Sequence, residues 1–348
     1  MIDSYDDFWS NIKKTELPIV LYGTGNGADM ILSEFERRGI RVQACFASDG
    51  FVRSRFFHEF RVISYSDAVR KFGRMAVILG FGTHDRSVIE NIMRIGRENE
   101  LYMPDMLRDD EGHLFDAEYA AKHKDDIEWA YSILEDEKSR QSYESVIRYR
   151  LTGRIDYLLD GQEDDEKSWK LLEIGRDESF VDIGAYNGDT IERFTSLAHS
   201  WNSIYGFEPD PKSFRKLQRN TEGLMNTEVF NAFVGDACGS VQFSGGKGRG
   251  SHKSSSHLLI QSLTIDSALD GRAATILKFD TEGYELEALC GGSETIRKYR
   301  PRMILSAYHK TDDFWRLPRN VLSLDSSYRF YMRKSPAIPY WDTNYYIV

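Results

Sequence analysis

The sequence predicts an α/β fold with two units, each built on a mostly parallel sheet covered by helices. Three observations predict it. Short apolar segments alternate with segments whose apolar residues recur at helical spacing. Two apolar segments run directly into glycine-rich turns, at residues 19–28 and 180–190. The chain has 348 residues and 41% of them are hydrophobic, which is enough for two packed cores.

The first unit is expected over residues 1–115 as a small Rossmann-like domain. An apolar strand at residues 19–22 leads into a glycine turn and then a helix. Strand and helix continue to alternate, which predicts a parallel sheet with helices on both faces. Further strands are expected within residues 41–49 and 75–83. Residues 60–73 are expected to form a short strand followed by a helix, and residues 87–96 a further helix.

A helical connector is expected over residues 116–167. Ile127 and Ala130 fall at helical spacing, as do Tyr143 and Ile147 further along. We therefore expect helices that pack against one unit or both.

The second unit is expected over residues 168–348. Five parallel strands followed by an antiparallel edge pair, with little room for a helix between the late strands, is the layout of class I methyltransferase domains. That layout is a Rossmann-like, mostly parallel sheet of seven strands. The candidate strands are residues 180–183, 203–207, 229–234, 275–279, 303–307, 329–333 and 345–348, and the candidate helices are 190–200, 211–220 and 284–299.

The turn after the first of these strands is a candidate ligand site. Gly184 and Gly188 let the backbone turn sharply and approach a bound molecule closely. Free amide groups at the start of the following helix favour an anionic or carboxylate group, whereas Asp182 at the strand end attracts a cation. A ligand that carries an ammonium and a carboxylate together, as S-adenosylmethionine does, satisfies both. The turn residues expected to contact it are Gly184, Ala185, Tyr186, Asn187, Gly188, Asp189 and Thr190.

Two further acidic residues follow later strands. Glu208 ends the second strand, where a carboxylate can accept both hydroxyls of a ribose. Asp236, in "FVGDACG", is placed to bind the exocyclic amine of adenine. Together with Asp182 they predict an adenosyl-binding crevice.

Several motifs of this half resemble the FkbM family of S-adenosylmethionine-dependent methyltransferases. They are "FVDIGAYNGDT", "YGFEPDPKSFRKLQRN", "LTIDSAL" and "ILKFDTEGYELEALCGGSETIRKYRPRMILSAYHK", in that order. The resemblance covers about residues 168–348 and implies O-methylation of a hydroxyl on a saccharide, nucleotide sugar or related small metabolite. It also implies that Asp182, Gly184, Asn187, Gly188 and Glu208 hold the cofactor.

Candidate catalytic residues lie after the fourth and fifth strands. Methyl transfer to a hydroxyl requires an oriented acceptor and removal of its proton. We expect His309 to accept the proton and Asp280 or Glu282 to orient the acceptor or the cofactor. Asp280 and Glu282 also suit the start of the following helix, and a solvated histidine is the simpler interpretation of His309. Carboxylates and imidazole suit divalent cations, but no tight ligand spacing is present, so no metal is expected.

The first unit carries a competing motif. "GTGNGA" at residues 23–28 fits a dinucleotide-binding pattern, with Asp49 after the next strand. One hypothesis is therefore an NAD-dependent oxidoreductase, although no Tyr-Lys or Cys/His pair accompanies the motif. A domain of this kind would equally suit the binding of a nucleotide sugar, a structural role, or non-catalytic docking in polysaccharide assembly.

Residues 244–257 are poor in apolar side chains and are expected to form a mobile loop. A plain surface loop is the simpler interpretation. If the loop closes over a substrate, Lys247, Arg249, His252 and Lys253 favour a phosphorylated or nucleotide-linked acceptor.

The bulk composition restricts the partners. A formal net charge of −10 argues against a nucleic-acid binder, which needs clustered Lys and Arg. Three scattered cysteines indicate neither a disulfide framework nor a zinc site. The first residues lack a secretory pattern and no apolar run is long enough to span a bilayer, so a cytoplasmic protein is expected. A small-molecule acceptor is the expected partner, and an oligomer is compatible with the sequence.

Overall fold

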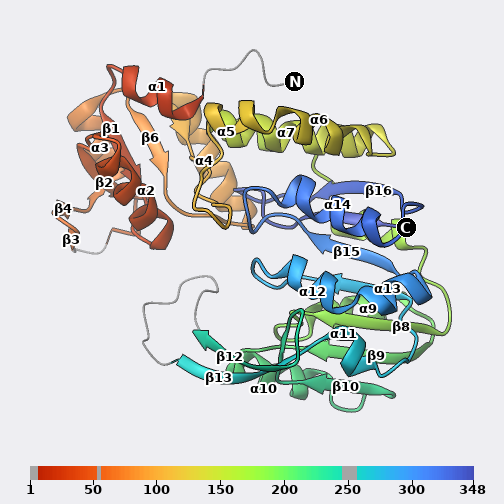
Figure 1. Cartoon of the computed structure of the whole chain (residues 1–348). Coiled ribbons are helices and arrows are strands. Elements are labelled where there is room, and N and C mark those ends of the chain that lie inside the picture. The colour runs from red at the N-terminus through yellow and green to blue at the C-terminus, as the bar shows by residue number, and fades with distance from the viewer. Residues whose placement is uncertain (1–6, 53–55, 245–256) are drawn as a thin grey trace. The chain divides into compact units, whose positions relative to one another are not determined.

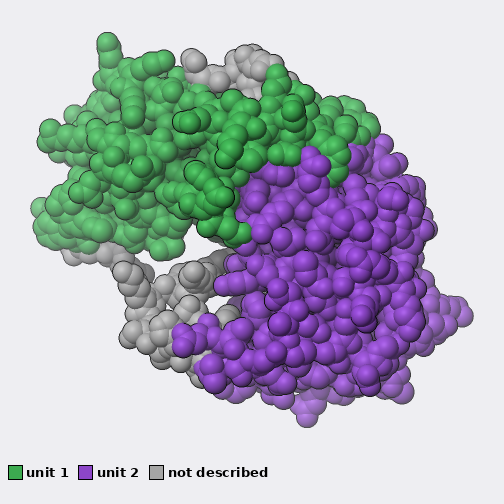
Figure 2. Space-filling view, viewed as in Figure 1, with its two compact units in different colours: residues 1–132, 137–163, 334–342 green, residues 133–136, 164–333, 343–348 purple. Residues whose placement is uncertain are grey.

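The computed structural model describes residues 7–52, 56–244 and 257–348. The chain forms two compact units, which Figure 2 colours separately. Unit 1 comprises residues 1–132, 137–163 and 334–342, and unit 2 comprises residues 133–136, 164–333 and 343–348. Each unit is thus assembled from separate stretches of chain. The functional division at residues 115 and 167 stays a prediction.

Unit 1 is built on a five-stranded sheet whose paired strands are all parallel, in the order β5-β2-β1-β6-β7 (Figure 1). β1 and β6 are buried along their whole length, as expected for strands in a sheet covered on both faces. The strands are β1 (Ile19–Tyr22), β2 (Ala44–Ala47), β5 (Ile63–Ser64), β6 (Ala76–Leu79) and β7 (Glu100–Tyr102), and β3 (Phe56–Phe57) pairs with β4 (Phe60–Arg61) in a separate hairpin.

The helices of this sheet follow the predicted alternation. In α2, Ile31 and Phe35 face the core, as their spacing predicts. Helix α1 and strand β7 were not expected from the sequence. Asp7 caps α1 by accepting a hydrogen bond from the amide of Ser10 at 2.9 Å. The helices are α1 (Phe8–Lys14), α2 (Asn26–Arg37), α3 (Tyr65–Phe72) and α4 (Arg86–Glu98).

The expected connector is helical and belongs to unit 1, except for residues 133–136 and the end of the segment. Arg150 in α7 is buried, and its Nε donates to Asp105 at 2.7 Å while its guanidinium lies 4.3 Å from the centre of the Phe115 ring. A buried charge needs such partners, so this contact fixes α7 against the loop after β7. The helices are α5 (Ala117–Lys122), α6 (Lys124–Ser132), α7 (Glu137–Thr152) and the 3₁₀ helix η1 (Ile155–Leu159).

Unit 2 is built on a seven-stranded sheet in the order β10-β9-β8-β14-β15-β17-β16. The pairings from β10 to β15 are parallel, and β17 is antiparallel to β15. This confirms the α/β fold and the predicted mostly parallel seven-stranded sheet. The strands are β8 (Glu178–Ile183), β9 (Trp201–Phe207), β10 (Thr227–Phe230), β14 (Ile276–Phe279), β15 (Arg302–Ser306), β16 (Phe330–Lys334) and β17 (Thr343–Ile347).

The order in which successive strands are added to this sheet reverses between β8 and β14. The first strands extend from β8 towards β10, and the later ones extend from β14 the other way. A crevice forms at such a switch point, outside the carboxyl ends of the strands. The helices that connect and flank the strands are α8 (Asp165–Trp169), η2 (Lys170–Leu172), α9 (Asp189–Leu197), α10 (Pro211–Asn220), α11 (Ile265–Leu269), α12 (Glu285–Gly291), α13 (Ser293–Tyr299) and α14 (Asp313–Leu324).

The predicted strand at residues 229–234 is divided between two sheets. Its first part is β10, and its end is β11 (Phe233–Val234), which pairs with β13 in a three-stranded sheet of order β11-β13-β12. The hairpin partners β12 (Gly239–Ser244) and β13 (His257–Leu263) are antiparallel and were not predicted.

The expectation that little room is left for a helix between the late strands was wrong: helix α14 lies between β15 and β16, and Pro318 lies in its interior. Proline has no amide hydrogen, so the carbonyl of Phe314, four residues earlier, loses its helical partner. The hydroxyl of Tyr345 on β17 donates to this carbonyl at 2.6 Å. A tertiary contact therefore compensates for the proline, and local sequence alone does not show it.

Within the described ranges, every helix falls short of the length and apolar character required to traverse a lipid bilayer.

Candidate functional site

The glycine turn, residues 184–190, begins where β8 ends, at the switch point of the sheet. The amides of Gly184 and Ala185 both donate to the carbonyl of Phe207 on β9, at 3.0 and 2.8 Å. Gly184 has φ 86°, and a Cβ there would clash with the backbone carbonyl oxygen of Asp280. The ends of β8 and β14 thus approach more closely than any side chain would allow, which explains the glycine.

The rest of the turn leads into α9. Gly188 has φ 89° and precedes the helix as its cap. The amide of Asp189 donates to Asn187 Oδ1 at 3.2 Å, and the amide of Thr190 donates to Asp189 Oδ1 at 2.8 Å. Tyr186 has φ 46° and is 52% exposed, so its side chain is open to a ligand. A non-glycine residue in this conformation is strained and is often found at functional turns.

Asp182, one residue before the end of β8, is fully buried. Among the described residues neither of its carboxylate oxygens has a hydrogen-bond partner. Lys278 stands directly beside it in register on β14, with its Nζ 3.5 Å from Asp182 and 3.4 Å from Asp280. Burial raises the pKa of Asp182 to about 6, against the opposing effect of Lys278. The carboxyl therefore lacks the full set of partners that a buried charge needs.

Glu208 directly follows β9, the strand next to β8. It is 7% exposed, and its two oxygens accept hydrogen bonds from the backbone amides of Tyr186, at 2.8 Å, and Asp210, at 2.7 Å. Burial raises the pKa of Glu208 to about 7, although both backbone hydrogen bonds favour the ionised form. The contact with Tyr186 joins the glycine turn and the predicted ribose-binding carboxylate in one site.

Asp236 lies on an exposed bend after β11. Among the described residues no hydrogen bond or ion pair links it to Asp182 or Glu208. Its role towards adenine stays a prediction.

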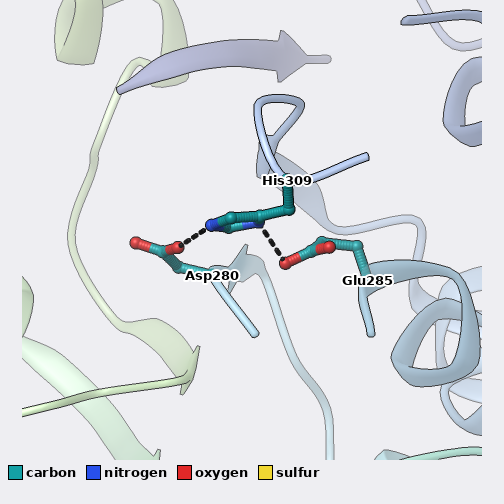
Figure 3. A group of neighbouring side chains, drawn as sticks. All are labelled: Asp280, Glu285 and His309. Atoms are coloured by element: carbon teal, nitrogen blue, oxygen red, sulfur yellow. Dashed lines mark hydrogen bonds and ion pairs between the residues drawn. The ribbon is translucent and has the colours of Figure 1, made fainter. Parts of the chain in front are cut away.

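The predicted catalytic residues do come together. His309 follows β15, and Figure 3 shows its ring between two carboxylates. Its Nδ1 is 2.9 Å from Glu285 Oε1, and its Nε2 is 3.5 Å from Asp280 Oδ1 and 3.9 Å from Glu282 Oε2. We call Asp280, Glu282, Glu285 and His309 the His309 cluster.

The electrostatics of the His309 cluster are dominated by a buried pair. The side chain of His309 is 8% exposed and that of Glu285 is 1% exposed. Burial would lower the pKa of His309, but the charge and hydrogen bond of Glu285 raise it to about 10. In turn His309 lowers the pKa of Glu285 to about 2, against the effect of burial. The ring is therefore an imidazolium at neutral pH in the ligand-free protein.

Glu285 is fixed in place by its surroundings. Its Oε1 accepts the amide and hydroxyl of Thr281, at 2.7 and 2.9 Å, in addition to His309. Its Oε2 is buried and has no hydrogen-bond partner among the described residues. The carboxylate is thus held in one position, and only one of its two oxygens has hydrogen-bond partners among the described residues.

Several residues of the site were missed in the sequence. Glu285 lies five residues after Asp280, at the start of the helix that the motif begins, and Lys278 is the single charge inside the apolar segment "ILKF". Both positions could have been recognised in the sequence as charged residues of the site. Tyr308 and Asp313 had no such signal: Tyr308 donates to Asp280 Oδ1 at 3.1 Å, and Asp313 accepts the amide of His309 at 3.0 Å.

The glycine motif of unit 1 forms a strand–turn–helix, as expected. Gly23 has φ 113°, and a Cβ there would lie 2.7 Å from the ring of Phe81. Asp49 accepts the amide and hydroxyl of Ser66, at 3.1 and 2.6 Å. The acidic residue that would bind a ribose is thus already engaged by the start of α3.

The basic residues of the expected loop, Lys247, Arg249, His252 and Lys253, lie outside the described residues.

Residues 182–333 match the family model of the methyltransferase FkbM domain. The structure is similar to that of the methyltransferase FkbM from Methylobacillus flagellatus KT, with 21% identity, a TM-score of 0.73, and coverage of 95% of this chain and 89% of that one. The fold is that of a Rossmann-like methyltransferase.

Two other solved structures match about half of the chain. One is precorrin-6y C5,15-methyltransferase from Geobacter metallireducens GS-15, with 12% identity, a TM-score of 0.34, and coverage of 52% of this chain and 84% of that one. The other is an rRNA methylase from Streptococcus thermophilus, with 17% identity, a TM-score of 0.33, and coverage of 53% and 94%. No curated protein matches the chain.

Proposed function

We propose that the protein transfers a methyl group from S-adenosylmethionine to a hydroxyl of a saccharide, a nucleotide sugar or a related small metabolite. Methyltransferase activity is supported by the FkbM domain. The observation that carries the choice of cofactor is the hydrogen bond between the Tyr186 amide and Glu208. It links the glycine turn to the carboxylate that we propose accepts the ribose hydroxyls, which supports an adenosyl ligand.

The residues present fit this cofactor. Asp182 is a buried carboxylate without a hydrogen-bond partner among the described residues, and an ammonium group of the ligand would supply one. Glu208 already accepts two amides, and its remaining lone pairs can accept ribose hydroxyls. The bound cofactor supplies an activated methyl group.

The acceptor side of the site is assigned to the His309 cluster. Asp280 is adjacent both to Gly184, in the glycine turn, and to His309. It is therefore the carboxylate best placed to orient an acceptor hydroxyl beside the cofactor. The hydroxyl must lose its proton as its oxygen bonds to the methyl carbon. His309 can take up that proton at Nε2 only from its neutral form, because Glu285 favours the imidazolium.

Two measurements test the proposal. Calorimetry with S-adenosylmethionine and with its demethylated product should detect one site per chain. Incubation with methyl-labelled cofactor and a panel of nucleotide sugars should then label an acceptor. Absence of heat with both cofactor forms would remove the proposal, whereas binding without label on any sugar would retain the cofactor and remove only the saccharide class.

A further inference from the structure

The His309 cluster has the composition and spacing of a cation site. Asp280, Glu285 and His309 each offer a ligand atom, and these atoms lie within 4.8 Å of one another. On the open side of the ring, Nε2 lies 3.5 Å from an oxygen of Asp280 and 3.9 Å from an oxygen of Glu282. Ligand atoms about 2.1 Å from a shared ion are separated by roughly 3–4 Å, and both distances from Nε2 fall in this range.

The orientation of the imidazole favours this assignment. Metal-bound histidines usually donate the N–H of their other ring nitrogen to a carboxylate, which fixes the tautomer and the ring orientation. Glu285 provides this contact at Nδ1, at 2.9 Å, and it is held in turn by Thr281. Nε2 is thereby directed towards Asp280, as Figure 3 shows. Glu282, the other carboxylate outside this pair, also lies on the side of Nε2.

Part of the buried negative charge beside His309 is not compensated by a hydrogen-bond partner among the described residues. Glu285 is almost fully buried, and its Oε2 is unpartnered among the described residues. Asp313 adds a second buried carboxylate next to the backbone of His309. The ammonium of Lys278 is directed to Asp182 and to the far oxygen of Asp280, away from the oxygen that faces His309.

One side of the cluster is open. The side chain of Glu282 is 68% exposed, whereas that of His309 is 8% exposed. Three protein ligands with an exposed side leave positions for water or for an oxygen of a substrate, which is the arrangement of catalytic rather than structural metal sites.

We propose that the His309 cluster binds one divalent first-row cation, with Nε2 of His309 and the carboxylates of Asp280 and Glu282 as ligands and Glu285 as the orienting partner of the ring. The ion replaces the proton that Nε2 carries in the ligand-free protein, and that proton passes to solvent. The mixed nitrogen and oxygen ligands favour Mn²⁺ or Zn²⁺. The expectation from the sequence that no metal binds is thereby revised. Only the catalytic use of the ion rests on the proposed function. With the ion bound, Nε2 is a ligand and does not accept the proton; the ion would instead bind the acceptor hydroxyl, and the proton of that hydroxyl would pass to water.

The test uses the full chain, stripped of metal with a chelator and then titrated with Mn²⁺ alone. Electron paramagnetic resonance measures free Mn²⁺ directly. We expect one Mn²⁺ bound per chain. We expect the dissociation constant to rise at least about 10-fold in His309→Gln and Asp280→Asn, and about 10- to 100-fold in Glu285→Gln, because loss of an orienting carboxylate has effects of this size. Glu222→Gln, at an exposed position, is the matched control and should bind as wild type.

A second measurement does not depend on the variants. Nitrogen NMR of ¹⁵N-histidine-labelled protein with Zn²⁺ should move the Nε2 resonance of His309 and leave Nδ1 as a hydrogen-bonded N–H. An unmoved Nε2 resonance, or Mn²⁺ affinities equal in all variants and wild type, overturns the proposal. Neither measurement contains cofactor or acceptor, so a protein that binds Mn²⁺ but not S-adenosylmethionine would contradict the proposed function and leave the cation site standing.

Discussion

Lys278 lies directly opposite Asp182 across the β8–β14 pair, and its ammonium is 3.5 Å from a carboxylate that is otherwise without a hydrogen-bond partner among the described residues. Burial would lower the pKa of Lys278, but Asp182 and Asp280 raise it above its usual value. The lysine is therefore charged, and it compensates both carboxylates.

Replacing Lys278 with methionine should destabilise unit 2. The substitution keeps most of the side-chain volume but leaves Asp182 buried without a cation, and breaking a buried pair in this way costs about 3–5 kcal/mol. Urea unfolding followed by tryptophan fluorescence should show a lower midpoint. Lys212→Met, at an exposed position of α10, should leave the midpoint unchanged. Equal midpoints for Lys278→Met and wild type would show that the pair contributes no net stability.

Gly184→Ala should disrupt the crevice through a steric clash. Gly184 and Gly223 have the same φ of 86°, so alanine is equally strained at both. At Gly223 no atom lies within 4 Å of the added methyl group, whereas at Gly184 it meets the carbonyl of Asp280. Cofactor affinity, measured by calorimetry, should therefore fall in Gly184→Ala and persist in Gly223→Ala. Similar losses in both variants would attribute the effect to backbone strain instead.

Cofactor binding should strengthen as the pH rises from 6 to 8. The pKa of Glu208 is raised to about 7, so the proton is held at pH 6 and the carboxylate that accepts ribose hydroxyls predominates at pH 8. The same shift means that the contribution of this group to the stability of the ligand-free protein decreases between pH 4.5 and 7. Calorimetry at a series of pH values checks the affinity.

Glu208→Gln separates this effect from titration of the cofactor itself. The variant should bind about 1–3 kcal/mol more weakly at pH 8, the usual cost of leaving polar groups unpaired. It should also lose the part of the pH dependence centred near 7. A pH dependence unchanged by the substitution would remove Glu208 from the ribose site. Glu222→Gln serves as the exposed control.

His309→Gln should lower turnover while cofactor affinity persists. His309 lies on the acceptor side of Asp280, and none of its hydrogen bonds or ion pairs among the described residues reaches the glycine turn or Glu208. Loss of a proton acceptor typically costs about 10²–10⁴-fold in rate. The comparison needs the rate with a labelled acceptor and the calorimetric affinity of the same preparation. An equal loss of both would contradict a role confined to the acceptor.

The strands that position the site could be predicted because they are short, apolar and bounded by turns. Asp182 and Glu208 could be placed at strand ends, and parallel strands bring such ends to one edge. Helix α14 could not be predicted, because its proline is compensated by Tyr345, a residue distant in sequence. The hairpin of β12 and β13 was missed because the intervening residues are glycine- and serine-rich and mask the pairing of their flanks.

The chemistry of the site was harder to predict than its location. The sequence indicated that His309, Asp280 and Glu282 would gather, but the protonation of His309 depends on Glu285. In the sequence, Glu285 looks like an ordinary residue of a helix surface. Its contact with His309, 24 residues later, arises only because α12 packs against the segment after β15. Burial and charge are properties of the folded chain, so the pKa of a candidate base is the part of a site that sequence patterns reveal least.

The segment 334–342 determines where the gene can be divided to express one unit alone. It joins β16 to β17, yet it belongs to unit 1, where Ile338 exchanges backbone hydrogen bonds with Thr83. A gene fragment that starts at residue 164 would encode all seven strands of the large sheet but would deprive this segment of Thr83 and lose residues 133–136. No single cut releases either unit whole, so neither unit can be transplanted into another protein as one continuous piece of gene.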